Sequence, residues 1–282
     1  MPAPLPTPFR IDRPAPPAIE LRGATKRFAS PVGGVYTALL DLNLAVPAGE
    51  FCAIVGPTGS GKSTTLSLIS GLERPSSGEV RRFGRPVEGV GPEVGFVFQA
   101  DAVFPWKTVL DNVTAGLRFR NVPAGEARER ARDWVARVGL AGFEAYYPHQ
   151  LSGGMRKRVA LAQSLITEPR ILLMDEPFSA LDAQTRALME DELLALWAAS
   201  GATVVFVTHD LEEAVSLADR VVVLTAGPAT VKGSYPVDLP RPRDVAEIRF
   251  QPRFAEIHRE IWADVRSEVL LSYERSKQRP AS

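Results

Sequence analysis

Gly56-Pro57-Thr58-Gly59-Ser60-Gly61-Lys62-Ser63 is the stretch from which the fold of this chain can be inferred. Residues 50–55 before it are mostly apolar and predict a buried strand, and residues 64–71 after it predict a helix. A strand, a glycine-rich turn and a helix in this order form a phosphate-binding loop, or P-loop, in which backbone N–H groups and the helix N-terminus face the anion. We expect Lys62 to reach the β- and γ-phosphates of a bound nucleotide and the Ser63 hydroxyl to ligate Mg²⁺.

The composition of the 282-residue chain is that of an ordinary globular protein. Apolar residues make up 45% of it, and 33 Lys and Arg balance 33 Asp and Glu, so the formal net charge is zero. A nucleic-acid surface would need a basic excess, so we expect no nucleic-acid partner. We find no apolar run long enough to cross a membrane and no signal peptide at the N-terminus. The one cysteine, Cys52, is expected to be a buried core residue.

Three regions follow from the patterns along the chain. Residues 1–18 contain seven prolines and are predicted to form a disordered tail without a role in the fold. Residues 19–243 form the main domain, in which apolar strand patterns alternate with helical ones and predict an α/β fold with a mostly parallel sheet. A helical subdomain is expected at about 100–165. Residues 244–282 predict a C-terminal helical appendage, whose apolar stripe comprises Phe254, Ile257, Ile261, Val265 and Leu270.

A second strand supplies the carboxylates that phosphate chemistry requires. Residues 171–174 are apolar and predict a buried strand, and Asp175-Glu176 follow at its carboxyl end, where α/β proteins bind their ligands. We expect Asp175 to hold Mg²⁺, directly or through water, and Glu176 to act as general base for an attacking water. The alternative is that these residues form only a turn at the end of a strand. The P-loop in the same chain favours the catalytic interpretation.

Leu151-Ser152-Gly153-Gly154-Met155 predicts the start of a helix. Ser152 is a suitable N-cap, and the two glycines permit another backbone or a ligand to approach closely. Free N–H groups at such a helix end can bind phosphate. Taken alone, the stretch fits a capped helix and an anion site equally well.

The order of these motifs resembles the nucleotide-binding subunit of an ABC transporter. The resemblance covers about residues 19–240. It implies a P-loop NTPase core with a mostly parallel sheet, an antiparallel β subdomain and an inserted helical subdomain, with ATP and Mg²⁺ as ligands. The motifs that carry it are Gly56 to Thr64, Gln99, Leu151 to Met155, Asp175-Glu176, Asp182 at the end of Ser179-Ala180-Leu181-Asp182, and His209.

The resemblance also implies a role for each motif residue. Gln99 would sense Mg²⁺ and water and link the site to a transmembrane partner, and it joins Ser63 and Asp175 as a metal-site residue. His209 would contact the γ-phosphate, so that Glu176, His209, Gln99 and Lys62 form the catalytic set. The signature residues Ser152, Gly153 and Gly154 would contact the γ-phosphate held by the other subunit, and Asp182 would lie at the dimer seam. Phe28 best matches the aromatic residue that stacks on adenine, with Tyr36 as the alternative.

A narrower similarity points to importers of nitrate, sulfonate and taurine. It lies in residues 98–113, which include Phe104-Pro105-Trp106, and in Val237-Asp238-Leu239-Pro240-Arg241-Pro242-Arg243. The same subfamily includes importers of bicarbonate and pyrimidine precursors. The expected partners are a second ATPase subunit, giving a homodimer with two composite sites, transmembrane permease subunits and, indirectly, a substrate-binding protein. The protein would lie peripherally on the cytoplasmic side of the cell membrane. The alternatives are a soluble ABC ATPase that acts on nucleic acid or ribosomes and a non-hydrolysing regulatory subunit.

Overall fold

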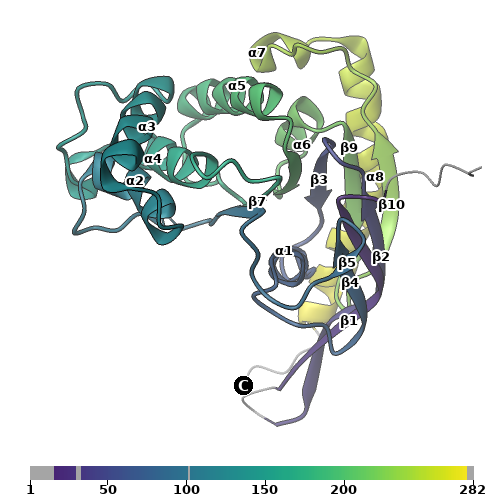
Figure 1. The fold of residues 1–282 in the computed structure, drawn as a ribbon. Coiled ribbons are helices and arrows are strands. Elements are labelled where there is room, and N and C mark those ends of the chain that lie inside the picture. The colour runs from purple at the N-terminus through teal and green to yellow at the C-terminus, as the bar shows by residue number, and fades with distance from the viewer. Residues whose placement is uncertain (1–15, 30–32, 101, 278–282) are drawn as a thin grey trace, which may run out of the picture.

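The computed structural model describes residues 16–29, 33–100 and 102–277 (Figure 1). Most of the predicted proline-rich tail lies outside these residues. For Ala18 the prediction of a tail without a role in the fold is wrong, because its side chain is fully buried. Its carbonyl also accepts a hydrogen bond of 2.9 Å from the backbone N–H of Phe83. The packed part of the chain therefore includes Ala18.

A six-stranded sheet forms the centre of the molecule. Five of its strands are parallel, and the sixth, at one edge, is antiparallel to its neighbour. Four of the parallel strands are buried on both faces along nearly their whole length, which explains their uninterrupted apolar runs in the sequence; they are residues 51–55, 171–175, 203–207 and 220–224. This arrangement confirms the predicted mostly parallel sheet. In spatial order the strands are β10 (Val231–Pro236), β9 (Arg220–Leu224), β3 (Phe51–Val55), β8 (Thr203–Val207), β7 (Ile171–Asp175) and β6 (Val94–Val97).

A smaller antiparallel sheet packs beside the first and confirms the predicted antiparallel part. Its strand order is β2 (Val35–Val46), β1 (Ile19–Ala29), β4 (Ser77–Arg82) and β5 (Arg85–Pro86). Strand β1 continues past Gly23, where its register shifts against both β2 and β4. Apolar side chains of β1 and β2 pack with those of β3 in one buried cluster.

The helices fall into two groups. Helices α2 (Val109–Phe119), α3 (Ala124–Arg137) and α4 (Gly153–Leu165), with the short 3-10 helix Pro148–Gln150, lie to one side of the sheets (Figure 1). They share a buried apolar cluster of their own, within the range expected for the helical subdomain. Helices α1 (Lys62–Ser70), α5 (Ala183–Ser200) and α6 (Leu211–Leu217) belong to the α/β core.

The C-terminal region contains α7 (Val245–Ile248) and α8 (Pro252–Lys277), and α8 packs against α6, β9 and β10. Four residues of the predicted apolar stripe are buried, but Leu270 is 52% exposed, so that part of the prediction is wrong. Leu270 follows Val265 by five residues. At about 100° per residue, its side chain points about 140° away from that of Val265. Glu268 takes the buried position instead and accepts hydrogen bonds from Ala226 N–H at 2.8 Å and Lys232 Nζ at 2.8 Å. Within the described residues, no helix is long and apolar enough to cross a membrane.

Candidate active site

The P-loop joins β3 to α1 and encloses the ammonium group of Lys62. Lys62 is 7% exposed, and its Nζ donates hydrogen bonds to the carbonyls of Gly56 at 2.9 Å and Pro57 at 3.1 Å. Gly61 has a φ of 76°, and a Cβ there would lie 2.5 Å from Leu39 Cδ2, so glycine alone fits this position. The predicted phosphate-binding residues therefore form a tight turn with a cation at its centre.

The electrostatics of the loop depend on two nearby carboxylates. Burial lowers the pKa of Lys62, and the charges of Glu176 and Asp175 oppose that shift. Burial raises the pKa of Asp175, while a hydrogen bond from Ser63 lowers it, the Glu176 charge raises it and the Lys62 charge lowers it. A further cation beside Asp175 would favour its ionised form.

Two predicted metal ligands lie side by side. The Ser63 hydroxyl donates a hydrogen bond of 3.1 Å to Asp175 Oδ1. Both are hard oxygen donors, and Mg²⁺ commonly takes one or two protein oxygens and completes its coordination with water and substrate phosphates. Among the residues that the structure describes, no group of three His, Cys, Asp or Glu side chains could hold a metal ion. The pair therefore fits a Mg²⁺ ion that binds together with nucleotide phosphates.

Glu176 lies where three strands of the sheet end. Its Oε2 accepts a hydrogen bond of 3.3 Å from Gln99 Nε2 and lies 3.1 Å from His209 Nδ1. Its backbone has a φ of 43°, a region that non-glycine residues seldom occupy, and its N–H donates to the Val207 carbonyl at 2.8 Å. Since β6, β7 and β8 are neighbours, the residues that follow them meet at one edge. Three predicted catalytic side chains are thus brought together.

The two candidate adenine-stacking residues are partners across β1 and β2. Phe28 pairs with Tyr36 in the antiparallel register, so both side chains lie on one face of the hairpin. Phe28 is half-buried against the core, and Lys26 Nζ lies 4.9 Å from the centre of its ring. The Tyr36 hydroxyl donates a hydrogen bond of 3.4 Å to the Gly59 carbonyl. Tyr36 therefore contacts the P-loop directly, and Phe28 lies opposite it.

The signature stretch and Asp182 also lie close together. Ser152 caps α4 by accepting a hydrogen bond of 3.3 Å from Met155 N–H. Asp182 caps α5 and accepts bonds from Thr185 N–H at 3.0 Å and Thr185 Oγ1 at 2.7 Å, which lower its pKa. A Cβ on Gly154 would lie 2.9 Å from Thr185 Cγ2, so glycine allows the starts of α4 and α5 to approach. Leu151 is buried beside them.

Our sequence reasoning missed two residues near these groups. Lys157, on α4, is 4% exposed, and its Nζ donates a hydrogen bond of 2.6 Å to the Gln99 carbonyl. A lysine among the apolar residues of a predicted helix was the available signal. Trp262, on α8, lines a cavity of about 490 Å³ together with His209 and His258. The His258 ring also stacks on Phe254, with centroids 6.3 Å apart.

Comparisons with known proteins give a consistent family. Residues 39–179 match the model of the ABC transporter family. An uncharacterized ABC transporter ATP-binding protein of Methanocaldococcus jannaschii is 48% identical over 85% of this chain and 88% of its own length. An aliphatic sulfonates import ATP-binding protein of Bacillus licheniformis is 40% identical over 91% of this chain and 98% of its own.

A solved structure extends the similarity to three dimensions. It is an ATP-binding cassette in a dimeric post-hydrolysis state bound to ADP and Pi. Its alignment with this chain has a TM-score of 0.70 and 34% sequence identity. The alignment covers 79% of this chain and 100% of the solved cassette.

Proposed function

Because the chain belongs to the ABC transporter family of ATP-hydrolysing subunits, we propose that it powers the import of a small solute. The convergence of Gln99 and His209 on the Glu176 carboxylate is the observation that carries this proposal. A regulatory nucleotide-binding subunit would not need a carboxylate held in this way next to a P-loop. The same observation argues against the non-hydrolysing alternative.

The proposed mechanism assigns one task to each side chain. Lys62, whose ammonium group lies within the P-loop, and the P-loop N–H groups bind the β- and γ-phosphates. Ser63 and Asp175 would hold Mg²⁺, which when bound would neutralise charge on the phosphate oxygens. Glu176 accepts a proton from the attacking water, and its two neighbours, Gln99 and His209, hold the carboxylate in position.

Each nucleotide site would use two chains. Helix α4, which begins with the signature, packs against α2, α3, α5 and β6, whereas α1 packs against β7, β8 and the smaller sheet. The signature therefore starts on a different part of the molecule from the P-loop. A two-fold axis that pairs two copies head to tail gives two identical sites, each P-loop covered by the other chain's Ser152, Gly153 and Gly154. The dimeric state of the similar cassette supports this arrangement.

The solute proposed is a small molecule or ion of the sulfonate, taurine or nitrate type. Support comes from the relative named for aliphatic sulfonates, which aligns over 98% of its length. A bicarbonate or pyrimidine-precursor importer is the alternative within the same subfamily. The transported molecule would contact permease and binding-protein subunits, which this chain would join peripherally on the cytoplasmic side of the membrane.

Reconstitution tests the proposal directly. The chain would be co-expressed with a permease and a binding protein, if its gene neighbours encode them, and the complex would be incorporated into lipid vesicles. We expect ATP-dependent uptake of a labelled solute, tested with taurine, alkanesulfonates, nitrate and bicarbonate. Lys62→Ala should abolish uptake without dissociating the complex. Failure of the chain to copurify with any membrane subunit, while it hydrolyses ATP alone, would favour the soluble ATPase.

A further inference from the structure

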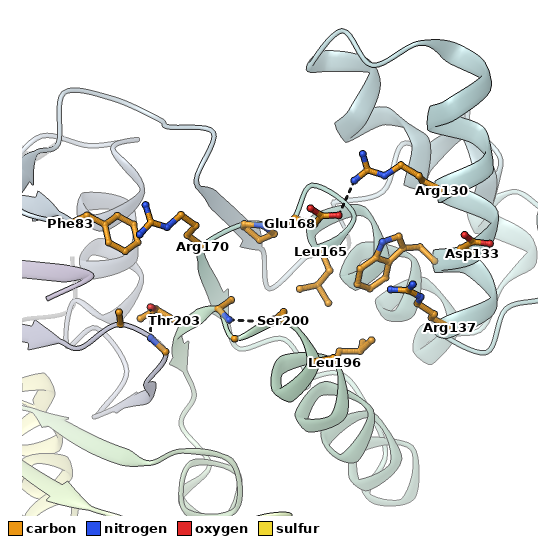
Figure 2. Close-up of a pocket in the computed structure, with 17 residues that line it drawn as sticks. Phe83, Arg130, Asp133, Arg137, Leu165, Glu168, Arg170, Leu196, Ser200 and Thr203 are labelled. Carbon is orange, nitrogen blue, oxygen red and sulfur yellow. Dashed lines mark hydrogen bonds and ion pairs between the residues drawn. The ribbon is translucent and has the colours of Figure 1, made fainter. Parts of the chain in front are cut away.

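A cavity of about 770 Å³ lies at the edge of the large sheet that faces away from the P-loop (Figure 2). Arg170 and Ala202, which line it, directly precede β7 and β8. Asp175 and His209 lie at or beyond the opposite ends of the same two strands. The cavity is therefore separate from the nucleotide site, and its volume is in the range of small-molecule sites, roughly 300–1,000 Å³.

The walls of this cavity come from distant parts of the chain. Figure 2 shows Phe83 and Arg170 on one side of the cavity. The other side is formed by three residues of α3, namely Arg130, Asp133 and Arg137. Apolar side chains from three helices complete it, namely Trp134 of α3, Leu165 of α4 and Leu196 of α5. A ligand in this space would contact both the helical group α2 to α4 and the α/β core.

Two arginine side chains of the cavity rest on aromatic rings. The Arg170 guanidinium lies 3.7 Å from the centre of the Phe83 ring, and the Arg137 guanidinium lies 5.2 Å from that of Trp134. In the part of the chain that the structure describes, neither forms an ion pair with a carboxylate. Arg130, in contrast, is paired with Glu168 at 3.0 Å. Stacking fixes a guanidinium plane and leaves its N–H donors available for an anion.

The charges that oppose an anion are few. The acidic lining residues are Asp133 and Glu168, of which Glu168 is already paired with Arg130. The carboxyl end of α5 also reaches the cavity at Ser200, and its carbonyl groups disfavour an anion there. An anionic group would therefore bind on the α3 wall beside Arg137, which also carries Trp134, and away from the end of α5.

We propose that this cavity binds a small organic anion with a planar aromatic body. A carboxylate, sulfonate or phosphate would accept hydrogen bonds from Arg137, and the ring would lie against Trp134, Leu165 and Leu196.

Calorimetric titration of the full-length protein with naphthalene-2-sulfonate tests this site. The uncharged naphthalene-2-sulfonamide serves as the matched probe. We expect one sulfonate per chain, and roughly tenfold weaker binding of the sulfonamide, because the amide loses a charge-assisted hydrogen bond. Arg137→Gln should weaken sulfonate binding by a similar factor. Arg132→Gln, which removes an exposed charge from the same helix outside the cavity, should change it less than about twofold.

Two further measurements keep the test decisive. Ala199→Phe should block the cavity from α5 and abolish sulfonate binding without a change in charge. Saturating ATP in a Glu176→Gln background should leave the sulfonate affinity unchanged, because the two sites lie at opposite ends of β7. The proposal is overturned if the wild-type protein does not bind the sulfonate, if Arg132→Gln weakens binding as much as Arg137→Gln, or if ATP displaces the probe.

Discussion

His209 Nδ1 lies 3.1 Å from Glu176 Oε2, although 33 residues separate them in the chain. The two residues follow the neighbouring parallel strands β8 and β7, so the pairing of these strands sets their distance. Gln99, beyond β6, reaches the same oxygen at 3.3 Å. The carboxylate is thus contacted from two sides, by residues that follow β6 and β8, the strands on either side of β7.

Replacement of Glu176 by Gln should reduce the ATPase rate at least about 100-fold, because the amide cannot accept the proton of the attacking water. ATP binding should be retained, since the P-loop is unchanged. Steady-state ATPase assays and equilibrium ATP binding measure the two effects. Glu88→Gln, an exposed carboxylate away from the site, is the control and should have wild-type activity. Normal turnover in Glu176→Gln would show that Glu176 is not the base.

Substitution of the signature serine should separate hydrolysis from nucleotide binding. Ser152→Arg places a large side chain where the proposed partner nucleotide would lie, and we expect the ATPase rate to fall about 100-fold. The affinity of the protein's own P-loop for ATP should stay within about twofold. Because Ser152 also caps α4, Ser152→Thr keeps the cap and is the control for folding. Equal loss of ATP binding and hydrolysis in Ser152→Arg would argue for a site within one chain.

The adenine-stacking residue can be identified by paired substitutions. Phe28 rests on the core and offers a rigid surface, whereas the Tyr36 hydroxyl is engaged with the P-loop. Base stacking on an aromatic ring contributes about 1–3 kcal/mol. We therefore expect Phe28→Leu to weaken ATP binding about tenfold and Tyr36→Leu to weaken it less than about threefold. The reverse order, measured by fluorescent nucleotide titration, would assign stacking to Tyr36.

Glu190 should make the stability of the fold depend on pH. It is fully buried, its Oε2 accepts a hydrogen bond of 3.1 Å from Arg249, and its Oε1 has no hydrogen-bond partner within the described residues. Burial raises its pKa to about 8; the charges of Glu213 and Asp210 add to the shift, and those of Arg249 and Arg186 oppose it. The native state therefore keeps a proton that the unfolded chain releases near pH 4.5. Its contribution to stability is complete below that value and is lost as the pH rises through 8.

The variant Glu190→Gln removes this titration. Relative to wild type, its free energy of unfolding should rise between pH 5 and pH 8 by up to about 1.4 kcal/mol per pH unit. Denaturant unfolding at several pH values measures the difference. Glu247→Gln, on the exposed side of α7, should show no such trend. A constant difference between Glu190→Gln and wild type across this range would contradict the raised pKa.

Much of the fold could be predicted because its signals are local. The apolar runs before Gly56 and at residues 171–174 are buried parallel strands, as their composition indicates. The motif order also predicted which strand ends would carry Glu176 and His209. Their hydrogen bond could not be predicted, because it depends on the order of strands in the sheet, which local patterns do not encode.

Other features depend on contacts between distant segments. Lys157 is buried because α4 packs against β6, which brings its ammonium group to the Gln99 carbonyl. Leu270 is exposed because Glu268 finds hydrogen-bond partners on the β9–β10 hairpin. The cavity beside Arg170 forms only where α3, α4 and α5 meet the sheet edge. Periodicity along one segment contains none of this information.

The central claim is that two chains build each ATP site, and the mass of the Glu176→Gln variant in solution tests it most directly. One chain has a mass of 30.6 kDa. Light scattering with ATP and Mg²⁺ should show a species of about twice that mass, which reverts to one chain when ATP is removed. Ser152→Arg in the same background should prevent the change. A Glu176→Gln protein that binds ATP at its P-loop and stays at 30.6 kDa would contradict the two-chain site.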